Sequence, residues 1–213
     1  MYLKNSTDRV VVNWSRCQGR EARVILSLVR HGEPERGSGV TDPGDPPLSP
    51  TGRKHLEGAR GLVEADGYDA VYCSPLLRAT ESAEILAPGA RLRVEPDLAE
   101  FDRGAKRYLH WEDGAGAYRS YLAGDLSPWG TTLAEFRNRI HGAIERIREE
   151  HPGERVLAVT HGGVINNFFA MLLGSGQVSL FQPRYGSINR FRYLPDEGWT
   201  VVELNATGDR PQI

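Results

Sequence analysis

Two histidines, each followed by glycine, carry the clearest chemical signal in this sequence of 213 residues. His31 lies in Arg30-His31-Gly32, and His161 lies in Thr160-His161-Gly162-Gly163. Each motif follows a short run of branched apolar residues, over 24–29 and 156–159, which is typical of a buried parallel strand. Open α/β sheets bind their ligands at the carboxyl ends of such strands. If the two strands are neighbours, only ~5 Å of sheet spacing separates the two imidazoles.

The residues around these histidines indicate a site for an anion. Arg30 adjoins His31, and Arg78 is expected in the first turn of a helix that opens at Ser74-Pro75, after a strand over 70–73. Two guanidinium groups suit phosphate oxygens, and helix N-termini add unpaired N–H groups. Glycine at 32, 162 and 163 lets the backbone approach a ligand closely. The set predicts a phosphate cradle that contains an imidazole.

A histidine in such a cradle can act as a nucleophile. Neutral imidazole attacks phosphorus readily, and its ordinary pKa near ~6.5 leaves it largely unprotonated at neutral pH. Attack by His31 would form a phosphohistidine, and the departing alkoxide would then need a proton. A carboxylic acid in a dry pocket can supply that proton. Glu100, between the apolar residues Leu98 and Phe101, is the candidate acid, and Glu33 is the alternative.

The composition excludes several classes of protein. A net charge of −2, with 39% hydrophobic and 25% charged residues, is ordinary for a soluble globular protein and predicts neither nucleic acid nor a membrane as partner. No apolar run reaches the ~20 residues of a membrane span, and residues 1–22 contain no apolar stretch like that of a signal peptide. Cys17 and Cys73 are too few for a disulfide framework. We expect a cytoplasmic enzyme, monomeric or homodimeric, acting on a small phosphorylated metabolite.

A metal site is the alternative use of a histidine pair. Arg30 and Arg78 would repel a cation, and no clustered carboxylate or cysteine ligands accompany the histidines. The sequence therefore predicts no metal.

The order of the elements predicts an α/β fold: a three-layer α/β/α sandwich with a mostly parallel central sheet of about six strands and an antiparallel C-terminal strand. Ser49 and either Thr131 or Thr132 are predicted helix caps, and a closing hairpin is predicted over 187–204. We expect one domain over 23–205 with a lid over about 101–130 that contains one helix around residues 116–122, and a tail over 206–213 with disorder from Asn205. Residues 1–22 form an N-terminal extension of uncertain structure, in which Val10-Val11-Val12 is either an added edge strand or part of a loose segment.

Five segments in the correct order, spanning about Val24 to Tyr193, resemble the signature of the histidine phosphatase superfamily, in its phosphoglycerate-mutase-like branch. The segments are Leu28-Val29-Arg30-His31-Gly32-Glu33, Leu48-Ser49-Pro50-Thr51-Gly52, Tyr72-Cys73-Ser74-Pro75-Leu76-Leu77-Arg78, Leu98-Ala99-Glu100 and Thr160-His161-Gly162-Gly163-Val164-Ile165. The resemblance implies His31 as phosphoryl acceptor and Glu100 as proton donor. It also implies that Arg30, Arg78 and His161 hold the phosphoryl oxygens. No metal or organic cofactor is implied for a phosphatase of this family, whereas its mutases need a bisphosphoglycerate primer.

The sequence departs from the family pattern in two places. Many members carry Trp-Asn shortly after the first segment, where this chain has Arg36-Gly37. The aromatic, Gly and Trp-Glu-Gly that often follow the donor glutamate are replaced by Phe101-Asp102-Arg103-Gly104-Ala105-Lys106-Arg107. The cluster Arg103, Lys106 and Arg107 is either a solvated loop or a second anion site for a substrate carboxylate or further phosphate.

The sequence thus favours a metal-independent phosphatase for small phosphomonoesters. A mutase is the first alternative, although family mutases carry a longer insertion between the segments of Glu100 and His161. A protein phosphohistidine phosphatase is the second, although such proteins have an open groove without a lid. A noncatalytic phosphate-binding regulator is the third, although it would have no use for a proton donor.

Overall fold

Six strands form one mixed sheet in the computed structural model, which describes residues 23–36, 40–110 and 115–208. The strands are β1 (Val24–Arg30), β2 (Ala70–Cys73), β3 (Leu92–Val94), β4 (Arg155–Thr160), β5 (Ile188–Leu194) and β6 (Gly198–Ala206). The α-helices are α1 (Pro50–Asp66), α2 (Leu77–Leu86), α3 (Ala115–Leu122), α4 (Leu133–Glu150) and α5 (Gly162–Leu172). Two short 3₁₀ helices, η3 (Pro96–Leu98) and η5 (Ser127–Trp129), interrupt the connections.

The sheet has the predicted mixture of strand directions. Its order is β3-β2-β4-β1-β5-β6, in which the first four strands are parallel. The predicted closing hairpin is confirmed, because β5 pairs antiparallel with β1, and β6 pairs antiparallel with β5. β1 and β4 are direct neighbours, with Arg30 opposite Thr160. The residues that follow these two positions, His31 and His161, are therefore placed side by side.

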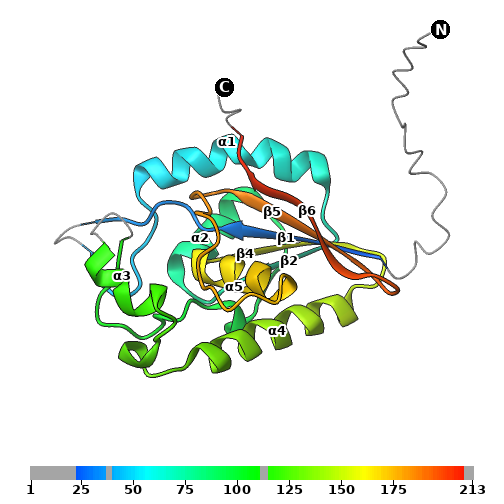
Figure 1. Ribbon diagram of the computed structural model, residues 1–213. Coiled ribbons are helices and arrows are strands. Elements are labelled where there is room, and N and C mark those ends of the chain that lie inside the picture. The colour runs from blue at the N-terminus through cyan, green and yellow to red at the C-terminus, as the bar shows by residue number, and fades with distance from the viewer. Residues whose placement is uncertain (1–22, 37–39, 111–114, 209–213) are drawn as a thin grey trace, which may run out of the picture.

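Helices cover both faces of the sheet, so the predicted three layers are present (Figure 1). Leu28 belongs to a core with α4 and α5, whereas the adjacent Val29 belongs to a second core with α1 and α2. This alternation follows from the period of two in a strand, and burial on both faces explains why the two runs are mostly apolar, with Ser27 as a buried polar exception.

The predicted helix caps are mostly confirmed. Ser49 Oγ accepts the Gly52 N–H at 2.9 Å at the start of α1, which ends before Gly67. Thr132, rather than Thr131, caps α4 and forms a reciprocal capping box with Glu135.

The start of α2 differs from the prediction, because the helix begins at Leu77 instead of at Ser74-Pro75. Ser74 does not cap it, since the Ser74 hydroxyl faces His161 at 2.7 Å. The Leu77 N–H is donated to the carboxylate of Asp45, at 2.9 and 3.0 Å to its two oxygens. The N-terminal cap of α2 therefore comes from Asp45 in a distant loop, and not from Ser74 at the predicted start of the helix.

The prediction of disorder from Asn205 is wrong, since β6 continues to Ala206. The Asn205 amide holds the strand end to the loop before β5. Its Oδ1 accepts the Arg184 N–H at 2.8 Å, and its Nδ2 donates to the Gln182 carbonyl at 2.8 Å. The N-terminal extension, with Val10-Val11-Val12, lies outside the described residues, as does the tail beyond residue 208.

The predicted lid region contains α3 and η5, and α3 fits the helix expected there. Among the helices of the described segments, none has the length and apolar character needed to cross a membrane.

Glycine at position 52 is required by the packing of α1 against the loop that follows His31. A Cβ there would lie 2.3 Å from the Glu33 carbonyl oxygen, whereas a Cβ at Gly61 of the same helix meets nothing within 4 Å. We expect Gly52→Ala to lower the free energy of unfolding by about 1–3 kcal/mol through overpacking. Gly61→Ala should raise it by up to about 1 kcal/mol. Urea unfolding of both variants tests this, and equal values would refute the packing argument.

Candidate active site

His31 lies directly after β1 and is buried, with 1% of its surface exposed. Its Nδ1 lies 2.7 Å from the Gly32 carbonyl oxygen, and its Nε2 lies 3.3 Å from Arg78 Nε, which donates to it. A carbonyl can only accept, so we assign the proton to Nδ1 and the lone pair to Nε2. Burial, and then the charges of Arg78 and Arg30, lower the pKa of His31 well below its usual value. The ring is therefore a neutral imidazole whose Nε2 can act as a nucleophile.

Arg78, in the first turn of α2, is fully buried, and carboxylate and aromatic side chains contact its guanidinium. Its Nη1 lies 3.3 Å from an Asp45 carboxylate oxygen, and its Nη2 lies 3.7 Å from one of Asp102. The Tyr108 ring lies against the guanidinium at 4.5 Å. Because a buried charge needs such pairing, these contacts fix the guanidinium beside His31.

Arg30 provides a second guanidinium from the end of β1. Its Nη1 donates to the Pro183 carbonyl at 2.7 Å, and its carbon Cζ lies 3.9 Å from the centre of the Tyr185 ring. Its Nε is buried and makes no hydrogen bond. Arg30 therefore has a donor available for an anion in the pocket.

His161, the residue before α5, faces His31 with 5.0 Å between the ring centres. Ser74 Oγ accepts the Leu76 N–H, so its own hydrogen can be donated to His161 Nε2 at 2.7 Å. The proton of the neutral ring then lies on Nδ1, which is buried and has no hydrogen-bond partner. Burial lowers the pKa of His161 well below its usual value, and the charge of Arg78 adds to the effect. His161 thus offers a neutral N–H donor.

Glu100 follows η3 and opposes the start of α5. One carboxyl oxygen accepts the Gly163 N–H at 2.8 Å, and the other accepts the Phe101 N–H at 3.2 Å. Burial, with a smaller contribution from the charge of Asp102, raises the pKa of Glu100 to about 7. A Cβ at Gly163 would lie 2.3 Å from Glu100, so glycine is needed for this approach. Glu100 can therefore hold a proton near neutral pH.

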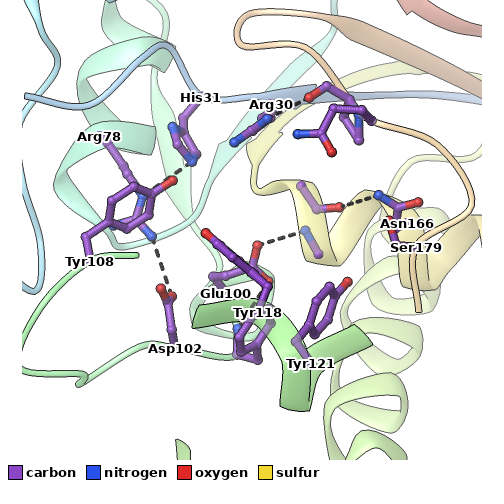
Figure 2. Close-up of a pocket in the computed structure, with 15 residues that line it drawn as sticks. Arg30, His31, Arg78, Glu100, Asp102, Tyr108, Tyr118, Tyr121, Asn166 and Ser179 are labelled. Atoms are coloured by element: carbon purple, nitrogen blue, oxygen red, sulfur yellow. Dashed lines mark hydrogen bonds and ion pairs between the residues drawn. The ribbon is translucent and has the colours of Figure 1, made fainter. Parts of the chain in front are cut away.

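These groups converge on one pocket with about 540 Å³ of space between its atoms, including the open mouth (Figure 2). The predicted residues in its lining are Arg30, His31, Arg78, Glu100 and Gly162. The predicted His161 is not in this lining, although its ring centre lies 5.0 Å from that of His31. The other residues of the lining are Phe101, Asp102, Tyr108, Tyr118, Tyr121, Gly163, Asn166, Ser179, Gln182 and Pro183.

Several predicted site residues are not in this lining. Arg103, Lys106 and Arg107 line a separate depression with Pro128 and Trp129. Their binding of a second anion stays a prediction, for a place outside the pocket of His31. Glu33, the alternative acid, is absent from the lining of the pocket. Gly32 donates its N–H to Ser82 Oγ at 3.0 Å, and a Cβ there would lie 2.7 Å from Leu56, so packing requires this glycine.

The sequence analysis missed several residues of the pocket, and the sequence held a signal for three of them. Asp102 lies only two positions after the candidate acid Glu100, within the predicted lid. Tyr118 and Tyr121 lie three positions apart in the helix expected near residues 116–122, and so share a helix face. Asp45, which contacts Arg78 from a loop rich in proline and glycine, gave no such signal.

No group of three potential metal ligands from His, Cys, Asp or Glu occurs within the described residues. The two histidines have guanidinium groups as their charged neighbours, which suits an anion better than a cation.

The sequence model of the histidine phosphatase superfamily (branch 1) matches residues 26–207. The chain belongs to this superfamily. Membership makes it a phosphatase of the histidine phosphatase type.

Known proteins of this superfamily are similar over most of the chain. The phosphoglycerate mutase-like protein 4 of Arabidopsis thaliana is 30% identical over 190 residues, which cover 83% of this chain and 82% of that protein. A metal-independent phosphoserine phosphatase of the same plant is 29% identical over 203 residues, covering 88% and 84%. A solved phosphoserine phosphatase from Entamoeba histolytica, in complex with 3-phosphoglyceric acid, has a TM-score of 0.69 at 23% identity, covering 86% of this chain and 98% of that one. This last similarity shows a shared fold.

The fork of donors on Arg78 should dominate phosphate binding by this histidine phosphatase. We expect Arg78→Lys to weaken binding of inorganic phosphate at least about tenfold, because one ammonium cannot donate to several acceptors in a planar fork. Arg60→Lys, on the exposed face of α1, is the matched control. Calorimetric titration gives both affinities, and unfolding curves confirm that both variants fold. Equal affinities would mean that Arg78 is not a phosphate ligand.

Proposed function

We propose that this protein is a metal-independent phosphatase that hydrolyses small phosphomonoesters through a phosphohistidine on His31. The observation that carries the proposal is the position of the unprotonated Nε2 of His31. It lies among two guanidinium groups and the imidazole of His161, in the same pocket as a carboxyl group with a pKa of about 7.

In the first step, His31 Nε2 attacks phosphorus, and the bond from phosphorus to the alcohol oxygen breaks. Arg30 Nε, the Arg78 guanidinium and His161 Nδ1 donate to the phosphoryl oxygens, where charge accumulates. The N-terminus of α5 adds a favourable dipole. Glu100 gives its proton to the departing oxygen, so the alcohol leaves neutral.

In the second step, the Glu100 carboxylate takes a proton from water as that water attacks phosphorus. The bond from phosphorus to Nε2 breaks, inorganic phosphate leaves, and Glu100 is again protonated. His31 returns to the neutral form that its surroundings favour. The proposed steps use no metal, as in the similar metal-independent phosphoserine phosphatase of Arabidopsis thaliana.

The nucleophile is tested by labelling. We expect His31→Ala to lose all measurable turnover and all acid-labile ³²P labelling from a labelled phosphomonoester, because His31 supplies the only imidazole among the described residues of the lining. His55→Ala, on the exposed face of α1, is the control. A labelled His31→Ala protein would overturn the assignment.

A separate assay distinguishes a hydrolase from a mutase. With 3-phosphoglycerate and primer, release of inorganic phosphate supports a hydrolase, and formation of 2-phosphoglycerate would indicate a mutase.

The proton donor is tested by pH. We expect kcat/KM for alkyl phosphates to fall above a pH of about 7, up to about tenfold per unit, because deprotonated Glu100 cannot protonate the alcohol. His31, whose pKa is lowered, adds no loss near pH 6.5. Nitrophenyl phosphate, whose leaving group needs little protonation, should show a weaker fall.

Alkyl phosphates and nitrophenyl phosphate also test a variant of Glu100, the proposed proton donor. Glu100→Gln should lose most activity toward alkyl phosphates and less toward nitrophenyl phosphate. Equal losses on the two substrates would show that Glu100 is not the donor.

A further inference from the structure

The charged groups of the pocket are gathered at one end. Arg30 and Arg78 are the only cationic side chains in the lining formed by the described residues, and both lie beside His31. One nitrogen of each guanidinium already has a partner within the protein, because Arg30 Nη1 donates to the Pro183 carbonyl and Arg78 Nη1 pairs with Asp45. The cationic cluster of Arg103, Lys106 and Arg107 lines a different depression.

Aromatic rings form the part of the pocket that would receive the alcohol. Figure 2 shows Tyr118 and Tyr121 on the opposite side of the pocket from His31. Phe101 stacks on Tyr121 with 4.5 Å between ring centres, and Tyr118 meets Tyr121 edge-on at 6.5 Å. These contacts make a fixed aromatic wall.

The hydroxyl groups of this wall are used within the protein. Tyr121 donates to the Val178 carbonyl at 2.7 Å and accepts from Asn167 at 3.3 Å, and Tyr118 donates to the Leu109 carbonyl. The part of the wall that meets the pocket is therefore ring surface, mainly that of the half-buried Tyr118, because Phe101 and Tyr121 are buried. Such a surface suits a planar or ring-shaped group.

The polar residues that line the pocket beside this wall carry either no charge or a negative one. Arg137 reaches Tyr121 through Asn167, but it lies outside the lining and donates to Asn167 and to the Ser175 and Gln177 carbonyls. Ser179 and Gln182 are neutral. The Asn166 amide is neutral too, and its oxygen accepts the N–H groups of Leu180 and Phe181. Glu100 and Asp102 are the acidic groups of the lining. A second anion on the substrate would thus meet carboxyl groups and no cation in the described lining, which disfavours its entry.

We propose that the substrate is a phosphomonoester of an uncharged, ring-bearing alcohol, and that phosphorylated carboxylic acids are discriminated against. The inference rests on the proposed function and names the substrate class for the same site. The proposed substrate class differs from phosphoserine, the substrate of a similar plant phosphatase, because phosphoserine carries a carboxylate.

Matched alkyl phosphates test the inference on the native protein. We expect kcat/KM for benzyl phosphate to exceed that for 4-carboxybenzyl phosphate at least about tenfold, and glycerol 3-phosphate to exceed 3-phosphoglycerate similarly. Benzyl phosphate should also exceed propyl phosphate about tenfold, because propyl phosphate has no ring. Equal or better hydrolysis of the carboxylated compounds, or no preference for the ring, would overturn the inference.

Binding of non-hydrolysable analogues separates this inference from the proposed function. Benzylphosphonate should bind the native protein at least about tenfold more tightly than 4-carboxybenzylphosphonate, whether or not the protein turns over any ester. Absence of turnover combined with this preference would refute the proposed function alone. Equal binding combined with turnover would refute the substrate class alone.

A positive charge added beside the wall should weaken the preference for the uncharged substrate. Ser179→Arg places a cation near the alcohol end, and Ser179→Gln is the uncharged control of comparable reach. We expect the ratio of kcat/KM for 4-carboxybenzyl phosphate to that for benzyl phosphate to rise about tenfold in Ser179→Arg only. An equal ratio in the two variants would mean that charge in this part of the pocket does not select the substrate.

Discussion

A guanidinium without solvent contact is the constraint around which the pocket is organised. Arg78 is fully buried, so its charge must be matched by groups of the protein. Asp45 approaches it from the loop before α1, and Asp102 approaches it from the segment after η3. Tyr108 lies against its face. Segments far apart in the sequence are thus held in one place by a single charge, and that charge points at His31.

The same burial has opposite effects on the two kinds of titratable group in the pocket. Removal from water disfavours charge, so it lowers the pKa of His31 and raises that of Glu100. Near pH 7 His31 is neutral, and Glu100, with a pKa of about 7, is still protonated in about half of the molecules. In the proposed mechanism the first is the nucleophile and the second the acid. The positive charge available to a phosphate dianion comes, among the described residues of the lining, from Arg30 and Arg78. Attraction and proton transfer are thereby assigned to different side chains.

Local patterns in the sequence were sufficient to predict the strands, the layers and most of the site. The apolar runs before His31 and His161 predicted buried strands, and their pairing places the rings 5.0 Å apart. Contacts between distant loops could not be read in the same way. Asp45 caps α2 from outside it, and this frees Ser74 for His161. Asn205, which local composition assigned to a disordered tail, is held by backbone partners that only the folded chain provides.

That asparagine connects the edge of the sheet to the phosphate end of the pocket. Asn205 fixes the backbone at Gln182 and Arg184, and the carbonyl of the residue between them, Pro183, receives Arg30 Nη1 at 2.7 Å. The orientation of a guanidinium from the first strand therefore depends on a residue in the last. A shortened or fused version of this enzyme has to retain the chain through Asn205, because the minimal catalytic unit extends to the outermost strand.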